Sequence, residues 1–267
     1  MALYFQSSCS SSSGNCLLLW TEHTRVLIDC GLGSMKRTRE LLNKNLGSRL
    51  DVDGVVISHM HSDHIGYYPL RVFETYGIKL RVHENSLLQL KAKHFNGYGF
   101  SSLKIRPFTE RPFRVGDLTF RPFELPHHPS YRTYGFVVKY KNKKVVIAAD
   151  FSDWRDLLGY FIDSDFIFVE SNHDLELLRR YYNPNSRFHM PNPETAKLLC
   201  SARKNSRKAP KAIMLGHLSL IRNEPAIALR EIENRLEKEG IELDFRLSAA
   251  PGLMASEVVR ISRAEHP

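Results

Sequence analysis

The sequence predicts one α/β domain over residues 1–267, in which two packed β-sheets are flanked by helices. Three features lead to this fold class. Many short apolar segments are strand-like, and several follow one another through short turns, as antiparallel strands do. Helical segments lie between groups of strands, and no repeat, long linker or change of composition divides the chain. A doubly wound parallel sheet is the alternative, and the hairpin-connected strands disfavour it.

The first half of the chain alternates strand-like and helical segments. The alternation in LYFQS predicts an initial strand, and the apolar runs CLLLWT and RVLIDCG predict two more. A helix is expected between Ser34 as its N-cap and Gly47 as its stop. VDGVVIS is typical of a buried strand. The expected strands are residues 3–7, 16–21, 25–31, 52–58 and 78–84, and the expected helices are residues 34–47, 66–77 and 86–95.

The second half predicts a group of strands followed by alternating helices and strands. LTFRPFEL, YGFVVKY and KKVVIAAD are successive strand segments, and the KYKNKK turn joins the last two as a hairpin. A helix begins with NPETAK, where Asn192 is the expected N-cap and Pro193 occupies the first turn. PAIALREIENRLEKEG is an amphipathic helix that ends at Gly240. The expected strands are residues 118–125, 134–140, 143–150, 165–171, 211–217 and 241–248, and the last helix is 225–240.

The composition is ordinary for a soluble globular protein, but the charge is not balanced. Lys and Arg outnumber Asp and Glu by 38 to 29, which favours an anionic partner, with nucleic acid first among them. No apolar run approaches the ~20 residues that span a bilayer, and no secretory signal is recognisable, so no membrane association is expected. Four cysteines without a CxxC pair predict neither a disulfide framework nor a cysteine zinc site. We therefore expect a reducing, cytoplasmic setting; the oligomeric state stays open.

Residues 58–66, SHMHSDHIG, concentrate metal-ligating side chains directly after an apolar strand. Imidazole and carboxylate are ligands for zinc, and also serve manganese and iron. If the chain stays extended, His59, His61 and Asp63 project to one side of it. His64 then points elsewhere. This arrangement suits two neighbouring metals, one held by the first two histidines and the other by Asp63 and His64; a histidine-rich polar loop without metal is the alternative.

Three further candidate ligands stand at the ends of later strands. His127 follows RPFEL, Asp150 ends VVIAAD and His217 ends AIMLG. Side chains at the ends of adjacent strands converge without being close in sequence. Asp150 can bridge two metals because a carboxylate has two oxygens, although alone it would be read as a turn or cap residue. His127 and His128 compete for one ligand position, and the alternation along FELPH favours His127.

Together these residues resemble the metallo-β-lactamase fold family. SHMHSDH is similar to the HxHxDH signature of that fold, and His127, Asp150 and His217 match its later metal-binding motifs in order. Three other stretches resemble segments of the YycJ/WalJ-like branch of the family, namely SSSSGNC at 10–16, ESNHDLELL at 170–178 and LGHLSLIRNEPAIAL at 215–229.

The resemblance implies an αββα sandwich of the metallo-β-lactamase type, with two divalent metal ions (zinc or manganese), a bridging hydroxide and hydrolysis. For the YycJ/WalJ-like branch it implies cleavage of DNA phosphodiesters by a 5′-to-3′ exonuclease. Asp63 and Asp150 are the expected catalytic residues. The ligand set that follows has His59, His61 and His127 on one ion, Asp63, His64 and His217 on the other, and Asp150 on both.

Other residues are expected around this centre. Asp29, in RVLIDCG, is expected to hold a metal-binding histidine, and its alternative is a polar residue that closes a strand. The candidates for supporting the ligands or contacting substrate are His128, Asn172, His173 and Ser219, for which capping or turn roles are the alternative. The candidate phosphate contacts are Arg71, Arg132, Lys204, Arg207 and Lys208, the last three within the basic run 201–211, whose alternative is a solvated helix end.

Two other functions stay open at this point. The same centre would also suit a small phosphodiester, a lactone or a thioester. A non-catalytic regulatory or binding protein on the same fold is the other possibility, and the intact set of ligands argues against it.

Overall fold

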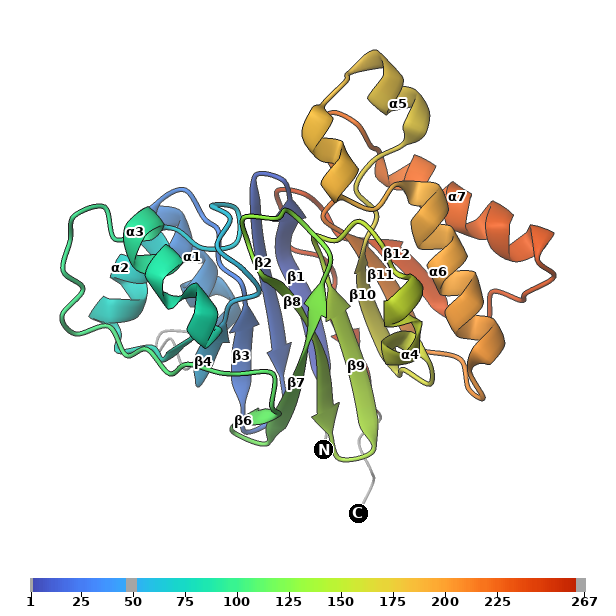
Figure 1. Ribbon diagram of the computed structural model, residues 1–267. Coiled ribbons are helices and arrows are strands. Elements are labelled where there is room, and N and C mark those ends of the chain that lie inside the picture. Colours follow the sequence, from blue (N-terminus) through green and yellow to red (C-terminus); the bar gives the residue numbers. More distant parts are fainter. Residues whose placement is uncertain (1, 47–51, 263–267) are drawn as a thin grey trace.

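The computed structural model describes residues 2–46 and 52–262, and these form two β-sheets packed face to face with helices on both outer sides (Figure 1). In the first sheet, β1 to β3 are antiparallel and β3 to β5 are parallel. Its strands, in the order β13-β1-β2-β3-β4-β5, are β1 (Tyr4–Ser11), β2 (Gly14–Trp20), β3 (Arg25–Ile28), β4 (Gly54–Val56), β5 (Leu80–Arg81) and β13 (Val259–Arg260).

The second sheet begins as an antiparallel meander and continues as parallel strands. Neighbouring strands from β6 to β9 pair antiparallel, and those from β9 to β12 pair parallel. The prediction of hairpin-connected strands in a sandwich is therefore confirmed. In the order β12-β11-β10-β9-β8-β7-β6, the strands are β6 (Phe113–Val115), β7 (Leu118–Leu125), β8 (Thr133–Tyr140), β9 (Lys143–Ala148), β10 (Phe166–Glu170), β11 (Ala212–Gly216) and β12 (Arg246–Ala249).

Each sheet has its own layer of helices. The helices that cover the first sheet are α1 (Met35–Leu46), α2 (Tyr67–Thr75) and α3 (Leu87–His94), preceded by the short 3₁₀ turn η1 (Glu84–Ser86). The segments that pack on the second sheet are η2 (Arg155–Leu157), α4 (Leu158–Phe161), α6 (Asn192–Asn205) and α7 (Pro225–Lys238). Two further segments, α5 (Leu175–Arg180) and η3 (Pro184–Phe188), lie in the chain between β10 and α6. Within the described parts of the chain, no helix is long and apolar enough to cross a membrane.

Three buried apolar clusters hold the layers together. The central one lies between the sheets, where the rings of Phe5 and Phe166 are 4.6 Å apart between centroids. The outer clusters join each sheet to its helices, for example through Phe73 of α2 and Ile232 of α7. Complete burial of one such side chain stabilises the fold by about 1.5–3 kcal/mol. The four layers therefore form one frame whose strand ends are fixed relative to one another.

Two predicted helix ends differ in outcome. Ser34 caps α1 as expected, because its Oγ accepts a hydrogen bond of 3.1 Å from the backbone N–H of Arg37. The expected stop at Gly47 lies outside the described residues. The prediction that Asn192 is the N-cap of the next helix is wrong, since Asn192 already belongs to α6. Its side chain is instead buried and bonded to Ser171 and Asn223.

Candidate metal centre

The segment after β4 carries the first group of candidate ligands. It leaves the strand extended and then turns, because the backbone N–H groups of His64 and Ile65 both donate to the carbonyl oxygen of His61. The expected alignment of Asp63 with His59 and His61 is therefore wrong. The turn rotates Asp63 away from them and places it beside His64.

Three other residues stand where strands end, in a backbone conformation that is uncommon for residues other than glycine. Asp29 follows β3, Asp150 follows β9 and His217 follows β11, with φ angles of 58°, 61° and 52°. Such left-handed conformations cost on the order of 1–3 kcal/mol and persist only where the surrounding structure imposes them. Their side chains contact other residues of the centre: Asp29 Oδ2 lies 2.7 Å from His64 Nδ1, and His217 Nδ1 lies 2.9 Å from Asp150 Oδ1.

His59, His61 and His127 bring ring nitrogens to one point. His59 Nε2 and His61 Nδ1 are 2.8 Å apart, and His127 Nε2 is 3.3 Å from the same His61 nitrogen. Asp150 Oδ2 lies 3.0 Å from His59 Nε2. These four residues form a group whose ligand atoms all lie within 4.8 Å of one another. The structure thus brings His127 into the group, rather than His128.

A second group of candidate ligands includes the same carboxylate. His64 Nε2 lies 2.9 Å from Asp150 Oδ2 and 3.4 Å from Asp63 Oδ2. His217 Nε2 lies 3.2 Å from that Asp63 oxygen. Asp63, His64, Asp150 and His217 again have ligand atoms within 4.8 Å of one another. Asp150 belongs to both groups.

Asp150 is the residue whose surroundings best test whether a cation fits. It is 1 % exposed, and several histidine nitrogens approach its oxygens within 3.0 Å. Nevertheless, neither oxygen has a hydrogen bond of acceptable geometry from any residue in the described ranges. A buried carboxylate without such bonds is costly. A metal ion shared by these side chains would need several lone pairs that lie close together and are not used in hydrogen bonds. The oxygens of Asp150 and the surrounding histidine nitrogens meet this requirement, so the donor set fits a divalent metal ion.

The outer nitrogen of three of these rings is held by an oxygen. His64 Nδ1 lies 2.7 Å from Asp29 Oδ2, to which it can donate, and His217 Nδ1 lies 3.0 Å from Glu170 Oε1. His127 Nδ1 lies 2.9 Å from the carbonyl oxygen of Phe188. A proton held on Nδ1 leaves Nε2 with a free lone pair that points into the centre, which is the usual arrangement of metal-binding histidines.

The histidines of the first group are neutral near pH 7. Burial lowers the pKa of His59 well below its ordinary value and lowers that of His61 to about 3. Burial also lowers the pKa of His127. Because metals bind the neutral imidazole, this group is ready to ligate without losing protons.

The second group is dominated by its carboxylates. Burial by itself would raise the pKa of Asp63 and Asp150, but the neighbouring His64 and His217 hold both pKa values well below the usual range. Burial also opposes charge on the two histidines, yet the carboxylates outweigh it and raise the pKa of both. A negative field that favours the charged form of two buried imidazoles is one that a divalent cation would also neutralise.

The serine-rich segment near the N-terminus forms the β1–β2 turn and packs directly on this centre. Asn15 Nδ2 donates to Asp63 Oδ2 at 3.2 Å, and Ser10 Oγ accepts from the backbone N–H of His217 at 2.8 Å. Gly31 lies between this turn and the ligand segment. A Cβ on Gly31 would fall 1.9 Å from the carbonyl carbon and oxygen of Asp63, so any side chain there would displace the turn.

Two residues that the sequence did not single out lie inside the centre. Glu170, at the end of β10, accepts from the backbone N–H of Phe151 at 2.9 Å and lies 2.7 Å from His189 Nδ1. His189 Nδ1 is also 3.4 Å from Asp150 Oδ1, and its ring stacks on that of His217. Glu170 follows the same strand-end rule as Asp150, which could have identified it. No comparable signal marks His189, which precedes α6 in irregular chain.

The remaining candidates lie around the centre in varied roles. Asn172 is buried and its Nδ2 donates to the carbonyl oxygen of His217 at 2.9 Å. His173 is buried beside it, with its Nδ1 3.3 Å from Asn172 Oδ1. Ser219 has the turn role given as its alternative, because its Oγ accepts from the backbone N–H of Arg222 at 3.1 Å. His128 is half-buried, and its Nδ1 accepts from the backbone N–H of Ser130 at 3.2 Å.

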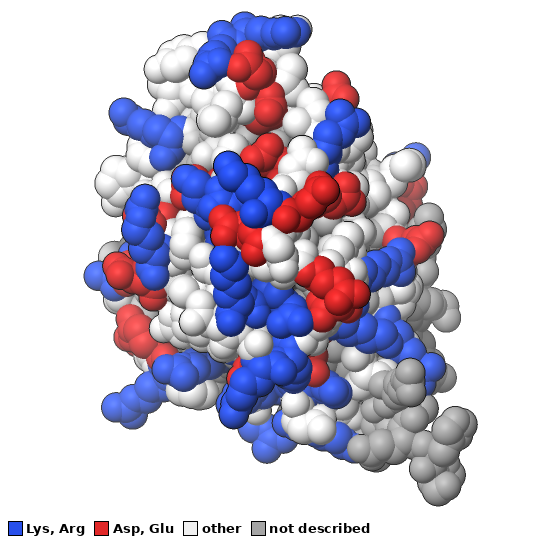
Figure 2. All heavy atoms as spheres, turned by 90° about the vertical axis from the view of Figure 1, so that its right-hand side faces the viewer, with Lys and Arg blue, Asp and Glu red and all other residues white. Residues whose placement is uncertain are grey.

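The basic run 201–211 does not lie at the centre. Its charges pair with carboxylates, for example Arg207 with Asp163 at 2.9 Å and Lys208 with Asp165 at 2.8 Å. Asp163 and Asp165 precede β10, whereas the centre follows it, so the run is at the opposite end of the strand. Figure 2 shows Lys and Arg mixed with Asp and Glu over the α6–α7 face. The pairing of Lys204, Arg207 and Lys208 with carboxylates away from the centre favours the alternative given for this run, a solvated helix end.

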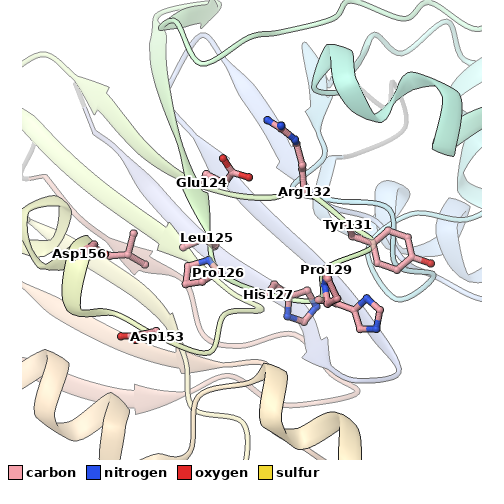
Figure 3. Close-up of a pocket in the computed structure, with 11 residues that line it drawn as sticks. Glu124, Leu125, Pro126, His127, Pro129, Tyr131, Arg132, Asp153 and Asp156 are labelled. Carbon is pink, nitrogen blue, oxygen red and sulfur yellow. The ribbon is translucent and has the colours of Figure 1, made fainter.

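The other two candidate phosphate contacts differ in position. The guanidinium of Arg71 lies 3.8 Å from the ring centroid of Tyr98. Arg132 lines a cavity of about 590 Å³ that also includes His127, with Asp153 and Asp156 on the facing wall (Figure 3). The Arg132 side chain extends away from His127 in this view.

A sandwich of two sheets with a buried histidine–aspartate centre between its strand ends defines a metal-dependent hydrolase. Residues 24–217 match the Beta-lactamase superfamily domain, and the chain belongs to this family. The fold of the family implies divalent metal ions, in agreement with the two groups described above and with a third, formed by Asp150, Glu170, His189 and His217.

Relatives with assigned names are similar over most of the chain. An exodeoxyribonuclease WalJ of Streptococcus pneumoniae serotype 2 (strain D39) is 28% identical over 249 residues, covering 89% of this chain and 90% of that protein. An exodeoxyribonuclease YycJ of Bacillus anthracis is 28% identical over 256 residues, covering 90% and 91%. The metallo-β-lactamase fold protein YhfI of Bacillus subtilis has a similar structure, with a TM-score of 0.74, 18% identity and coverage of 97% and 100%.

Proposed function

We propose that the chain is a two-metal phosphodiesterase that cleaves DNA as a 5′-to-3′ exonuclease and uses zinc or manganese. The observation that carries this proposal is the position of Asp150, whose two oxygens lack hydrogen bonds from the described residues and belong to both ligand groups. The proposed ligands are His59, His61 and His127 for one ion, Asp63, His64 and His217 for the other, and Asp150 for both.

Bound divalent ions would lower the pKa of a water molecule between them and neutralise charge on the phosphate. Asp63 is the proposed residue that orients this water. Its side chain is 20% exposed, whereas that of Asp150 is 1% exposed, so water can reach Asp63. Asn15 fixes the Asp63 carboxylate by donating to Oδ2, and the pKa of Asp63 is held well below its usual range, so the carboxylate stays ionised.

DNA is the proposed substrate for two reasons. Both named relatives are exodeoxyribonucleases, and each match extends over about nine-tenths of the chain. The formal net charge of +9 also favours a polyanion, whose binding releases condensed cations. The 5′-to-3′ polarity is the one that the resemblance to the YycJ/WalJ-like branch implies.

The test is a cleavage assay on duplex and single-stranded DNA labelled at the 5′ or the 3′ end, with zinc or manganese added. We expect release of short products from the 5′ end, and no cleavage by Asp150→Asn. Asp53→Asn is the matched control, because it makes the same change at an aspartate outside the centre, where Asp53 accepts a hydrogen bond from the backbone N–H of Arg25. Hydrolysis of a lactone or thioester without DNA cleavage would contradict the proposal. Full metal occupancy without any turnover would support a binding protein instead.

A further inference from the structure

A second cavity, of about 490 Å³, is lined by His189, whereas the one in Figure 3 is lined by His127. It lies between the segment after Asp150, represented by Ser152, and the segment that runs from α5 to α6. Figure 1 shows α5 projecting above the sheets, at the end opposite the two chain termini. His189 forms part of the cavity wall and lies 3.4 Å from Asp150 through its Nδ1, so the cavity reaches the ligand cluster directly.

The outer rim of this cavity carries an exposed aromatic ring and a cation. Tyr182 is 76% exposed, and among the described residues its side chain has no ring contact or hydrogen bond. The Arg187 guanidinium lies over the Phe188 ring at 4.6 Å, and no carboxylate in the described part of the chain pairs with it. In contrast, the nearby Arg155 is paired with Asp153 at 2.6 Å.

The two cavities therefore differ in charge. The one beside His127 is lined by three carboxylates, those of Glu124, Asp153 and Asp156, and by one guanidinium, that of Arg132. Asp153 is paired with Arg155, so two carboxylates stand against one cation there, and together they disfavour a phosphate. The cavity beside His189 has Arg187 on its rim, and its own carboxylate, Glu194, is already bonded to Lys197 and Trp154. Of these two cavities, the second is thus the one that favours a polyanion.

From this contrast we infer that the second cavity binds the nucleotide next to the scissile phosphate of a single-stranded DNA end, with Tyr182 stacking on its base and Arg187 contacting its phosphate. The inference rests on the proposed function. It adds to that function the path of the DNA strand past the metal centre and the requirement that the bound end be single-stranded. A stacked base needs an unpaired nucleotide, because a base within a duplex already stacks on its neighbours. The volume of the cavity lies in the range of sites that enclose a small ligand, about 300–1,000 Å³.

Tyr182→Ala tests the stacking. Loss of one aromatic–base contact is expected to raise KM for single-stranded DNA about tenfold, with a smaller effect on duplex DNA of the same sequence. KM for a single-stranded oligonucleotide that is abasic at that position, and so has no ring to stack there, is expected to stay unchanged. Tyr182→Phe keeps the ring and should behave as the unmodified protein. Tyr76→Ala is the matched control, since Tyr76 is an exposed aromatic residue at the end of α2.

Arg187→Ala tests the phosphate contact. The slope of log affinity against log salt concentration should become shallower by about 0.7, the value for one phosphate contact on a single strand. Arg207→Ala is the control, because Arg207 is paired with Asp163 at the far end of β10. If the unmodified protein cleaves DNA while Tyr182→Ala and Arg187→Ala leave KM and salt slope unchanged, the inference is wrong and the proposed function stands. If the unmodified protein cleaves no DNA, both are wrong.

Discussion

The two halves of the metal centre are built in opposite ways. The half from the first sheet comes from one short segment, in which His59, His61, Asp63 and His64 follow β4 within six positions. The half from the second sheet is assembled from single residues over the range 127–217, each placed by the end of a different strand or by a loop. The first half can be recognised in the sequence because its ligands stand close together along the chain. The second half forms only in the folded protein, where the parallel strands β9, β10 and β11 bring their ends together.

Support for the ligands follows the same division. In the first half, Asp29 holds His64 from the end of the adjacent strand β3. In the second half, Glu170 at the end of β10 lies 3.0 Å from His217 Nδ1, and His217 follows the neighbouring strand β11. In both halves, a carboxylate at the end of one strand orients a histidine that follows the neighbouring strand. Asp150 belongs to the ligand groups of both halves.

Asp150→Asn should have the largest effect, because it changes the residue that both halves share. Replacing one carboxylate oxygen by an amide removes a ligand from the proposed ions and the negative charge between them. We expect DNA cleavage to fall by about 1,000-fold or more, equivalent to about 4 kcal/mol of activation free energy, with unchanged circular dichroism. Activity within tenfold of the unmodified protein would show that the two halves work independently.

Glu170→Gln tests the second half on its own. The amide can no longer neutralise or firmly orient the Nδ1–H group of His217, and we expect metal affinity to fall by about 10- to 100-fold. Isothermal titration with zinc measures this change. Glu194→Gln is the control, since Glu194 is a partly buried carboxylate at the start of α6 that bonds Lys197 and Trp154 outside the centre. Equal affinities for both variants would mean that Glu170 does not support the metal site.

Asp29→Asn makes the corresponding change in the first half. The new amide would keep an oxygen for the backbone N–H of Ser58, which donates to Asp29 Oδ1 at 2.8 Å, but the charge beside His64 would be lost. We expect a loss of metal affinity of about tenfold, at the lower end of the range for such supports, measured by the same zinc titration. An effect much larger than that of Glu170→Gln would mean that the first half dominates metal binding.

Replacing Lys204, Arg207 and Lys208 together by Gln should have the smallest effect on function. These side chains pair with Glu239, Asp163 and Asp165 at the end of β10 away from the centre. KM for DNA should change by less than about twofold, because exposed ion pairs of this kind contribute little energy to the rest of the protein. An increase in KM comparable with that of Tyr182→Ala would place the DNA on this face instead.

The sequence could predict the sandwich and most of the centre because these depend on repeating physical rules. Apolar segments and their turns indicated the strands, and the strand-end rule brought His127, Asp150 and His217 together. The turn that redirects Asp63 was missed, because short-range backbone hydrogen bonds to the carbonyl oxygen of His61, rather than a side-chain pattern, determine it. His189 was missed since it lies in irregular chain, with no periodicity to place it.

The basic run shows a different limit. Residues 201–211 are dense in Lys and Arg, a pattern that predicts phosphate binding. Their partners Asp163, Asp165, Glu239 and Asp244 come from other places in the chain, so the neutralisation becomes visible only when the chain is folded. Arg187 lies outside any basic run, yet it stands beside the centre and pairs with no carboxylate within the described ranges.

Anomalous diffraction from crystals soaked in manganese or zinc would locate the ions themselves. We predict two ions on opposite sides of the Asp150 carboxylate, one contacted by His59, His61 and His127 and the other by Asp63, His64 and His217. A single ion, or two ions of which only one contacts Asp150, would contradict the shared-carboxylate centre.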